Sequence, residues 1–504
     1  MLAVDRLFVL RLSGDFYTKA RQTRLRFLRR LERNLDDALA SHGIPHRLER
    51  TWSRMVLASP DPGAPEVVAR VFGVQSVSEV ARRPWASLDD VVREGEAFFR
   101  DSVRGKSFAV RASRRGKRDA IPFDSPAIES ALGRALLPHA ARVDLARPEA
   151  TAHVEVEPGS AHFFHQRTAG LGGLPVGVEG RAVALVSGGF DSAVAAWLVL
   201  KRGVQLDYVF CNLGGAAHRL GALRVMRVIA QLWSYGYRPR LYEVDLRPLV
   251  EQLRERTRTR DWQVLLKRLM LRAAEAVARH GAAAGIVTGD AIGQVSSQTL
   301  QNLAVVSQAV TTPILRPLLG FNKEEILALA RRAGVYELAA AVGEFCALTP
   351  RRPATRARLQ TIVADEAALD LQALKTALDA RVAYDLRGLA EESLSPPAIA
   401  VERIPAGATV LDLRSADAFR AWHYPGSLHL EFPQAVAAYA AFGSDRTYLL
   451  VCEVGLKSAH LAERMREAGL DAFHLQGGMR VLKRLAEERG ELDPSRLAPA
   501  AHEG

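Results

Sequence analysis

The pattern of apolar and polar positions changes abruptly near residue 187. An apolar run with β-branched members, AVALV at 182–186, breaks at SGGFDS, 187–192, and resumes with helical spacing in AVAAWLVL, 193–200. This pattern predicts a buried strand that turns abruptly into a helix. The adjacent glycines let backbone amides crowd together at a helix N-terminus, where partial positive charge collects. The stretch therefore predicts an anion-binding loop, with a phosphate group as the expected ligand. The alternative for two glycines alone is a tight turn from strand to helix without a ligand.

Strand-like and helix-like segments continue to alternate over residues 181–390. This alternation is typical of an α/β fold with a doubly wound parallel sheet. Ligands of such sheets bind beyond the carboxyl ends of the strands, which is where SGGFDS falls. The pattern thus places a binding site at this loop.

The N-terminal part of the chain predicts two smaller α/β units. Residues 1–60 indicate a strand, a basic helix and further short strands, and residues 61–167 indicate a second unit. In the helix, Leu28, Leu31 and Leu35 share one face, as expected where a helix packs on a sheet. A Gly-rich connector, residues 168–180, leads to the central block.

The C-terminal part predicts one more compact α/β domain, residues 405–497, after a Pro-containing linker over 391–404. In YLLVCEVGLKSAHLAERM a buried strand ends at Cys452 and a helix begins near Ser458. We expect the thiol to face a ring of backbone amides at a helix N-terminus, a setting that stabilises a negative sulfur. Lys457 adds a full positive charge. The alternative is an inert buried cysteine.

Composition and charge favour a multidomain protein with an acidic partner. A chain of 504 residues predicts three or four domains at about 100–200 residues each. The formal net charge of +12 favours an acidic partner, nucleic acid first and a membrane surface second. We expect no membrane span and no secretory signal, hence a cytoplasmic protein. Three cysteines without C-x-x-C spacing exclude a disulfide scaffold and a cysteine zinc site.

Basic residues gather on the N-terminal helix. Six arginines lie between Arg21 and Arg33, with Glu32 as the acidic residue among them. The pattern indicates either a solvated helix face or a contact with a phosphate backbone. The candidates for contact with RNA, in this helix and in a later basic turn, are Arg21, Arg24, Arg29, Arg114, Arg115, Lys117 and Arg118.

The central block offers groups for a nucleoside triphosphate. Asp191 could hold Mg²⁺ near the phosphates, and Lys267 could reach them as a cation, unless it is an ordinary solvated lysine. Strand-end backbones could flank the base. The candidate ATP-binding residues are Leu185, Val186, Ser187, Gly188, Gly189, Phe190, Ser192, Phe210, Cys211, Lys267, Gly289 and Gln298.

Several of these stretches resemble known families. AVALVSGGFDS looks like the PP-loop of the ATP pyrophosphatases, and FAVRASRRG with VDLARPE resembles the RNA-binding THUMP domain. YLLVCEVGLKSAHLAERM with VLDLRSADAFRAWHYPGSLHL is similar to the rhodanese active-site region. QVLLKRLMLRAAE and TGDAIGQVSSQTLQN look like the tRNA 4-thiouridine synthase version of the PP-loop fold. In this order the motifs resemble the long form of that family, the tRNA uracil 4-sulfurtransferases of ThiI type.

The resemblance implies a multidomain α/β fold: a ferredoxin-like N-terminus, THUMP, a PP-loop adenylation domain and a rhodanese-like domain. It implies that uracil O4 of a tRNA uridine, expected at position 8, is adenylated with ATP and Mg²⁺, and that no prosthetic group is tightly bound. Cys452 would carry a persulfide, in a loop with Glu453, Gly455, Lys457 and Ser458, and Cys346 would become its disulfide partner. Cys211 receives no role in sulfur chemistry.

The resemblance also implies partners. These are tRNA, a cysteine desulfurase as the sulfur donor, a thiol reductant and, for a second role, the sulfur-carrier protein of thiamine biosynthesis. The oligomeric state is open, with a homodimer as one arrangement.

Two other functions remain alternatives from the sequence. An amide-forming PP-loop ligase would use ammonia in place of sulfur, and labelled sulfur in the product would distinguish it. A non-catalytic tRNA-binding sulfur relay would have a vestigial nucleotide loop, and tRNA-dependent release of pyrophosphate from ATP would exclude it.

Overall fold

The computed structural model describes residues 6–50, 54–116, 120–342, 350, 352–396 and 398–488. The chain divides into two compact units. The first comprises Met1–Glu179 with Lys201–Gly203, and the second comprises Gly180–Leu200 with Val204–Gly504. Within the described residues, no helix has both the length and the apolar character needed to cross a membrane.

The first sheet of the N-terminal unit has the strand order β10-β4-β1-β3-β2. Its strands are β1 (Arg6–Leu12), β2 (Arg47–Arg50), β3 (Arg54–Ser59), β4 (Val74–Glu79) and β10 (Thr168–Ala169), with helices α1 (Arg21–Ser41) and α2 (Ala64–Ala69). Helix α1 buries Phe27, Leu28, Leu31 and Leu35, so the apolar stripe expected from the sequence faces the core.

This sheet extends beyond residue 60, where the sequence placed the end of the first unit. Strand β4 pairs antiparallel with β1, and β10 pairs with β4. Strand pairing of this kind joins segments far apart in sequence, which a local change of pattern does not reveal. The expected connector also belongs to this unit, since Arg30 Nε and Asn34 Nδ2 donate to the carbonyl oxygen of Val176 over 2.7 and 3.1 Å.

The second sheet of the same unit has the order β5-β9-β8-β6-β7. Its elements are β5 (Ala81–Pro84), β6 (Ser107–Arg114), β7 (Arg142–Val143), β8 (Ala150–Glu157), β9 (Ser160–Phe164), α3 (Leu88–Val103) and α4 (Ser125–Leu136). Both helices begin at side-chain caps, Ser87 for α3 and Asp124 for α4. Phe99, Phe108 and Phe163 fill the core between helices and sheet.

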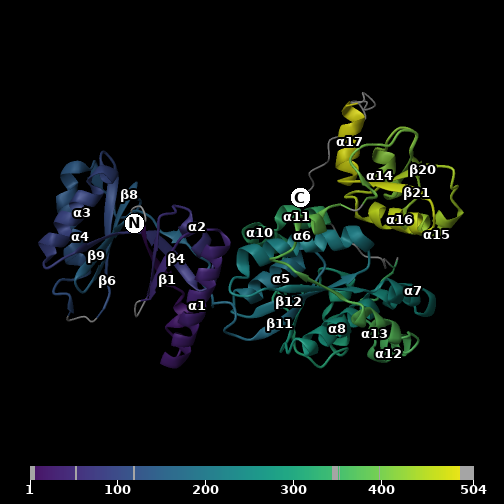
Figure 1. The fold of residues 1–504 in the computed structure, drawn as a ribbon, viewed down its shortest axis with the longest axis horizontal. Coiled ribbons are helices and arrows are strands. Elements are labelled where there is room, and N and C mark those ends of the chain that lie inside the picture. The colour runs from purple at the N-terminus through teal and green to yellow at the C-terminus, as the bar shows by residue number, and fades with distance from the viewer. Residues whose placement is uncertain are drawn as a thin grey trace. The chain divides into compact units, whose positions relative to one another are not determined.

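The central sheet of the second unit has the order β15-β14-β11-β12-β13-β16. Its strands are β11 (Arg181–Val186), β12 (Gln205–Asn212), β13 (Arg240–Asp245), β14 (Ile286–Val287), β15 (Ile314–Leu315) and β16 (Val382–Asp385). Its helices are α5 (Phe190–Leu200), α6 (Gly215–Trp233), α7 (Arg247–Arg256), α8 (Trp262–His280), α9 (Leu300–Ser307), α10 (Lys323–Ala333), α11 (Tyr336–Val342), α12 (Leu359–Glu366) and α13 (Gln372–Asp379). All pairings are parallel except that of the edge strand β16. The expected doubly wound sheet is confirmed, and Figure 1 shows helices on both of its faces.

The last sheet is parallel, with the order β17-β21-β20-β18-β19. Its elements are β17 (Ala400–Val401), β18 (Thr409–Asp412), β19 (Leu428–His429), β20 (Thr447–Val451), β21 (Asp471–Leu475), α14 (Ala416–Ala421), α15 (Phe432–Ala438), α16 (Leu456–Glu467) and α17 (Gly478–Glu488). Strand β17 lies inside the expected linker, because it pairs with β21 and is part of the domain. Helix α16 begins at Leu456, slightly before the expected Ser458.

Candidate active site

The SGGFDS loop connects β11 to α5, as the sequence predicted. Gly188 has φ +82°, a left-handed conformation that favours glycine, and a Cβ there would come within 3.0 Å of the Ala222 backbone. Ser192 Oγ accepts from Ser187 N over 3.3 Å and donates to the carbonyl of Gly189 over 3.2 Å. The loop is therefore held in a tight turn that leaves the N-terminus of α5 open to a ligand.

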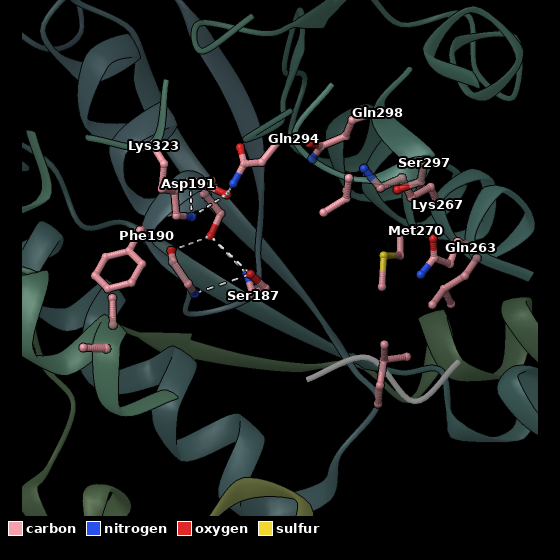
Figure 2. A pocket seen from close by; sticks show the side chains of 17 residues that line it. Ser187, Phe190, Asp191, Gln263, Lys267, Met270, Gln294, Ser297, Gln298 and Lys323 are labelled. Atoms are coloured by element: carbon pink, nitrogen blue, oxygen red, sulfur yellow. Dashed lines mark hydrogen bonds and ion pairs between the residues drawn. The ribbon is translucent and has the colours of Figure 1, made fainter. Parts of the chain in front are cut away.

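Two adjoining cavities open at this loop. The larger, of about 390 Å³, is lined by Ser187, Gly189, Phe190, Asp191, Ser192, Leu213, Gln263, Leu266, Lys267, Met270, Gln294, Val295, Ser297, Gln298, Lys323, Ala339 and Ala340. Figure 2 shows Asp191, Gln294 and Lys323 meeting on one side of it, with Lys267, Gln263 and Met270 on the other. The smaller, of about 230 Å³, adds Leu185, Val186, Cys211, His218, Gly289 and Asp290.

Asp191 sits at the N-terminal turn of α5 with two partners that the sequence analysis missed. Lys323 Nζ lies 3.0 Å from Asp191 Oδ1, and Gln294 Nε2 donates to Oδ2 over 2.9 Å. Lys323 begins α10, 132 residues further along the chain. No local motif links such distant residues, so only the fold could identify Lys323 as a cation at this site.

Lys267, on α8, lines both cavities. Its Nζ lies 2.7 Å from Asp290 Oδ1, and Arg316 Nε lies 3.2 Å from Oδ2 of the same carboxylate. Burial opposes ionisation of Asp290, but the attraction of Lys267 and hydrogen bonds outweigh it and hold the pKa of Asp290 below its ordinary value. An ionised Asp290 thus fixes the position of the ammonium group.

The remaining predicted nucleotide residues divide into two groups. Leu185, Val186, Cys211, Gly289 and Gln298 line the smaller cavity. Phe210 and Gly188 line neither cavity: the ring of Phe210 packs edge-on against His218, and Gly188 packs against α6. Their backbones shape the wall behind the cavity rather than its surface.

Gln298 and Cys211 illustrate two kinds of buried polar group in this wall. Gln298 is only 8% exposed, and its Oε1 has no hydrogen-bond partner among the described residues. A buried amide oxygen without a partner costs free energy, so it favours a ligand that donates to it. Burial raises the pKa of Cys211 to about 12, which keeps this thiol protonated and unreactive.

Cys452 follows β20 and faces the first turn of α16, as predicted. Its Sγ accepts from the backbone amides of Gly455 over 3.2 Å and Ser458 over 3.4 Å. The turn requires Gly455, whose φ is +98°. Of the expected amide ring, two backbone amides contact the sulfur, together with the Ser458 hydroxyl at 3.4 Å.

Cys452 is 3% exposed, yet it lines a further cavity. This cavity, of about 410 Å³, is lined by Val342, Leu413, Arg414, Ser415, Cys452, Glu453, Val454, Leu456 and Lys457. The guanidinium group of Arg414 is held by hydrogen bonds from its Nε and Nη2 to the carboxylate of buried Asp412. Arg414, Lys457 and Glu453 thus place two positive charges and one negative charge around the space in front of the sulfur.

The predicted RNA contacts lie mostly on the surface of the first unit. Arg21, Arg29 and Arg115 are exposed and Arg24 is partly buried. Arg114 is partly buried and donates to the backbone carbonyl of Phe123 over 3.0 Å, which suits a structural role. Lys117, Arg118 and Cys346 lie outside the described residues.

The fit of a magnesium ion to the site depends on Asp191. Within the described residues, no group of three or more His, Cys, Asp or Glu side chains is placed to hold a metal ion. Mg²⁺ bound with a nucleotide commonly uses one or two carboxylates together with phosphate oxygens and water. A single carboxylate beside the phosphate loop fits that mode.

The chain matches four family models in order. These are the ThiI ferredoxin-like domain over residues 7–78, the THUMP domain over 86–164, the thiamine biosynthesis protein ThiI over 177–371 and the rhodanese-like domain over 397–484. A tRNA sulfurtransferase of Pyrobaculum aerophilum is 34% identical over 466 residues, which cover 92% of this chain and 95% of the relative. The chain belongs to the tRNA sulfurtransferase family.

A second relative and a solved structure are also similar to this chain. The tRNA sulfurtransferase of Escherichia coli O139:H28 is 32% identical over 92% of this chain and 98% of its own length. A crystal structure of a 4-thiouridine synthetase–RNA complex with bound ATP matches with a TM-score of 0.66 and 28% identity, covering 75% of this chain and 99% of that chain. These comparisons confirm the family resemblance and fold class predicted for this member of the tRNA sulfurtransferases.

Proposed function

We propose that this protein is an ATP-dependent tRNA sulfurtransferase that makes 4-thiouridine, at position 8 of tRNA. The observation that carries the proposal is the presence, in one chain, of a phosphate loop beside a large cavity and of a cysteine held by backbone amides. The first site suits activation of an oxygen, and the second suits delivery of sulfur. The 4-thiouridine synthetase bound to RNA and ATP supports this assignment.

In the first step, uracil O4 attacks the α-phosphorus of ATP, the bond to the bridging oxygen breaks, and pyrophosphate leaves. The loop amides and Ser187 would hold the phosphates, and Lys267 and Lys323 would offset the charge that develops on them. Oxygen at C4 is a poor leaving group, and adenylation converts it into one. The uracil base of the tRNA would lie in the larger cavity. The adenine of ATP would lie in the smaller cavity, against Leu185 and Val186.

Asp191 would hold a magnesium ion against the phosphates, where the ion would neutralise part of their charge. Lys323 now pairs with the same carboxylate. This ammonium group would remain beside the phosphates as a second positive charge.

In the second step, the terminal sulfur of a Cys452 persulfide attacks C4, and the C4–O bond breaks to release AMP. A Cys346 thiolate then attacks Sγ of Cys452, which breaks the S–S bond and leaves sulfur on the base. The two thiols lose two electrons and become a disulfide, while the transferred sulfur gains them. In a variant of this step, Cys346 attacks first and the released sulfide attacks C4. A thiol reductant must then reopen the disulfide.

The placement of Val342 supports this partnership. Val342 lines the cavity at Cys452 and also lies beside Gly188 of the phosphate loop. Cys346 comes four residues later in the chain, and four extended residues span roughly 13–14 Å. The length of chain between Val342 and Cys346 therefore permits the proposed disulfide.

The partners follow from the same chemistry. Exposed Arg21 and Arg29 would contact tRNA phosphates. A cysteine desulfurase would load Cys452, and the thiamine sulfur-carrier protein would be a second acceptor, in keeping with the matching model of a thiamine biosynthesis protein. We expect the protein to act in the cytoplasm, and a homodimer would let tRNA span two subunits.

Two substitutions separate the half-reactions. Cys452→Ser should abolish thiolation while leaving tRNA binding and tRNA-dependent pyrophosphate release intact, because it removes only the sulfur carrier. Asp191→Ala should abolish pyrophosphate release and leave persulfide formation on Cys452 intact. Thiolation is measured by mass analysis of tRNA nucleosides, and the persulfide by alkylation and intact-protein mass.

Asp379→Ala, an exposed acid at the end of α13, is the matched control and should behave as the wild type. Full multiple-turnover thiolation by Cys452→Ser would contradict the persulfide role. Retained pyrophosphate release by Asp191→Ala would contradict the role of the loop.

A further inference from the structure

The carboxylate of Glu463, on α16, lies on the N-terminus of α6. Its Oε1 and Oε2 accept from the backbone amide of Ala216 over 2.9 and 3.1 Å, and it also accepts from Ala217. These amides belong to the first turn of α6, whose donors have no partner within the helix. Gly215 leaves room for the contact, because a Cβ there would overlap Glu463 Oε2. A rhodanese-domain side chain thus caps a helix of the adenylation domain.

Polar contacts of α16 surround this cap. Arg464 Nη2 lies 3.4 Å from Glu251 Oε1 of α7, and Glu467 Oε1 lies 3.9 Å from Arg247 Nη1. His460 hydrogen-bonds to the backbone of Gly214. The flanking ion pairs are long and partly exposed, so they contribute little by themselves. Burial raises the pKa of Glu463, while the hydrogen bonds from the backbone amides of Ala216 and Ala217 favour the carboxylate. These short hydrogen bonds make Glu463 the directional contact of the group.

The first turn of α6 also forms part of the nucleotide site. His218 lines the smaller cavity and hydrogen-bonds to the backbone of Ser187 in the phosphate loop. Leu213, just before the helix, lines both nucleotide cavities. One short segment therefore contacts the phosphate loop on one side and the sulfur-carrying domain on the other.

We propose that Glu463 is a positioning residue for sulfur transfer: by capping α6 it docks the rhodanese-like domain so that Cys452 reaches the adenylated base. This inference rests on the proposed function. Glu463 touches neither nucleotide cavity nor the cavity at Cys452, so it should affect neither half-reaction by itself. Loss of Glu463 should therefore slow only the transfer of sulfur from Cys452 to the adenylated base.

The test compares full-length Glu463→Ala with Glu487→Ala, an exposed glutamate of α17, as the matched control. Three rates are measured: tRNA-dependent pyrophosphate release, persulfide loading of Cys452, and single-turnover thiolation by protein already carrying the persulfide. We expect Glu463→Ala to release pyrophosphate and to load the persulfide at the wild-type rates. Its single-turnover thiolation rate should fall at least about tenfold, because small misplacements of reacting groups cost large factors in rate. Glu463→Gln, which keeps an acceptor oxygen, should fall between Glu463→Ala and the wild type.

Unchanged single-turnover thiolation would overturn the proposal, and so would an equal fall in all three rates, which would indicate a general loss of structure. Hydrogen exchange at the Ala216 amide, measured without substrates, tests the contact separately. Protection should be lost in Glu463→Ala and kept in Glu487→Ala, and equal protection in both would also overturn the proposal. If the wild type makes no 4-thiouridine, the proposed function is wrong. The hydrogen-exchange result would still show whether Glu463 caps α6.

Discussion

At the scale of single residues, Gly289 shows how little space separates the nucleotide site from its supporting strands. A Cβ at this position would come within 2.6 Å of the Asp191 carbonyl carbon and 2.7 Å of the Ser192 amide nitrogen. Both are backbone atoms of the first turn of α5, which cannot swing aside as a side chain would. The glycine is therefore required by packing against the phosphate loop.

Gly289→Ala should displace the loop and cost about 1–3 kcal/mol in the free energy of unfolding, as overpacking of a tight interior does. Affinity for ATP should fall as well, measured by calorimetry. Gly320→Ala is the control, because a Cβ there meets no atom within 4 Å. Equal ATP affinity in the two variants would show that the loop tolerates the added methyl group.

At the scale of elements, α8 is held to two neighbouring helices by one buried charge cluster. Arg268 donates to the carbonyl of Val305 in α9 and to Glu366 of α12, and Arg272 also donates to Glu366. Burial opposes ionisation of Glu366, but the hydrogen bonds from both arginines outweigh it and hold its pKa below the ordinary value. The helix that presents Lys267 to the nucleotide cavity is thereby fixed in place.

Glu366→Ala should destabilise the protein by about 3–5 kcal/mol, because it leaves buried Arg268 without its anionic partner. Since the pKa of Glu366 is lowered on folding, its stabilising contribution is complete above the ordinary carboxyl pKa of about 4.3 and is lost as the pH falls through the folded value. Denaturant unfolding across acidic pH measures both effects. Glu324→Ala, an exposed residue of α10, should change stability little, and an equal loss in both variants would refute the role of the cluster.

The elements that carry local signals were predictable from sequence. The strand, loop and helix around SGGFDS, and the strand, loop and helix around Cys452, follow from apolar runs broken by glycines, and both agree with the structure. Contacts between segments far apart in sequence could not be predicted from such local patterns. Lys323 meets Asp191 only because α10 packs on α5, and β4 joins β1 only through the sheet.

At the scale of the whole molecule, the described residues form four β-sheets in two units, and the second unit contains both candidate sites. Helix α11 contributes to two of the cavities: Ala339 and Ala340 line the larger nucleotide cavity, and its last residue, Val342, lines the cavity at Cys452 and lies beside the phosphate loop. The net charge of +12 suits a polyanionic acceptor. Under the proposed function, activation and sulfur delivery would both take place in the second unit.

The most direct test follows labelled sulfur into tRNA. The full-length protein is loaded with a persulfide that carries ³⁴S on its terminal sulfur, mixed with unmodified tRNA, ATP and Mg²⁺, and the nucleosides are analysed by mass spectrometry. The account predicts ³⁴S-labelled 4-thiouridine, formed only when ATP is present, with one AMP released for each sulfur incorporated. Unlabelled or absent 4-thiouridine in tRNA from the loaded, ATP-supplied reaction would contradict it.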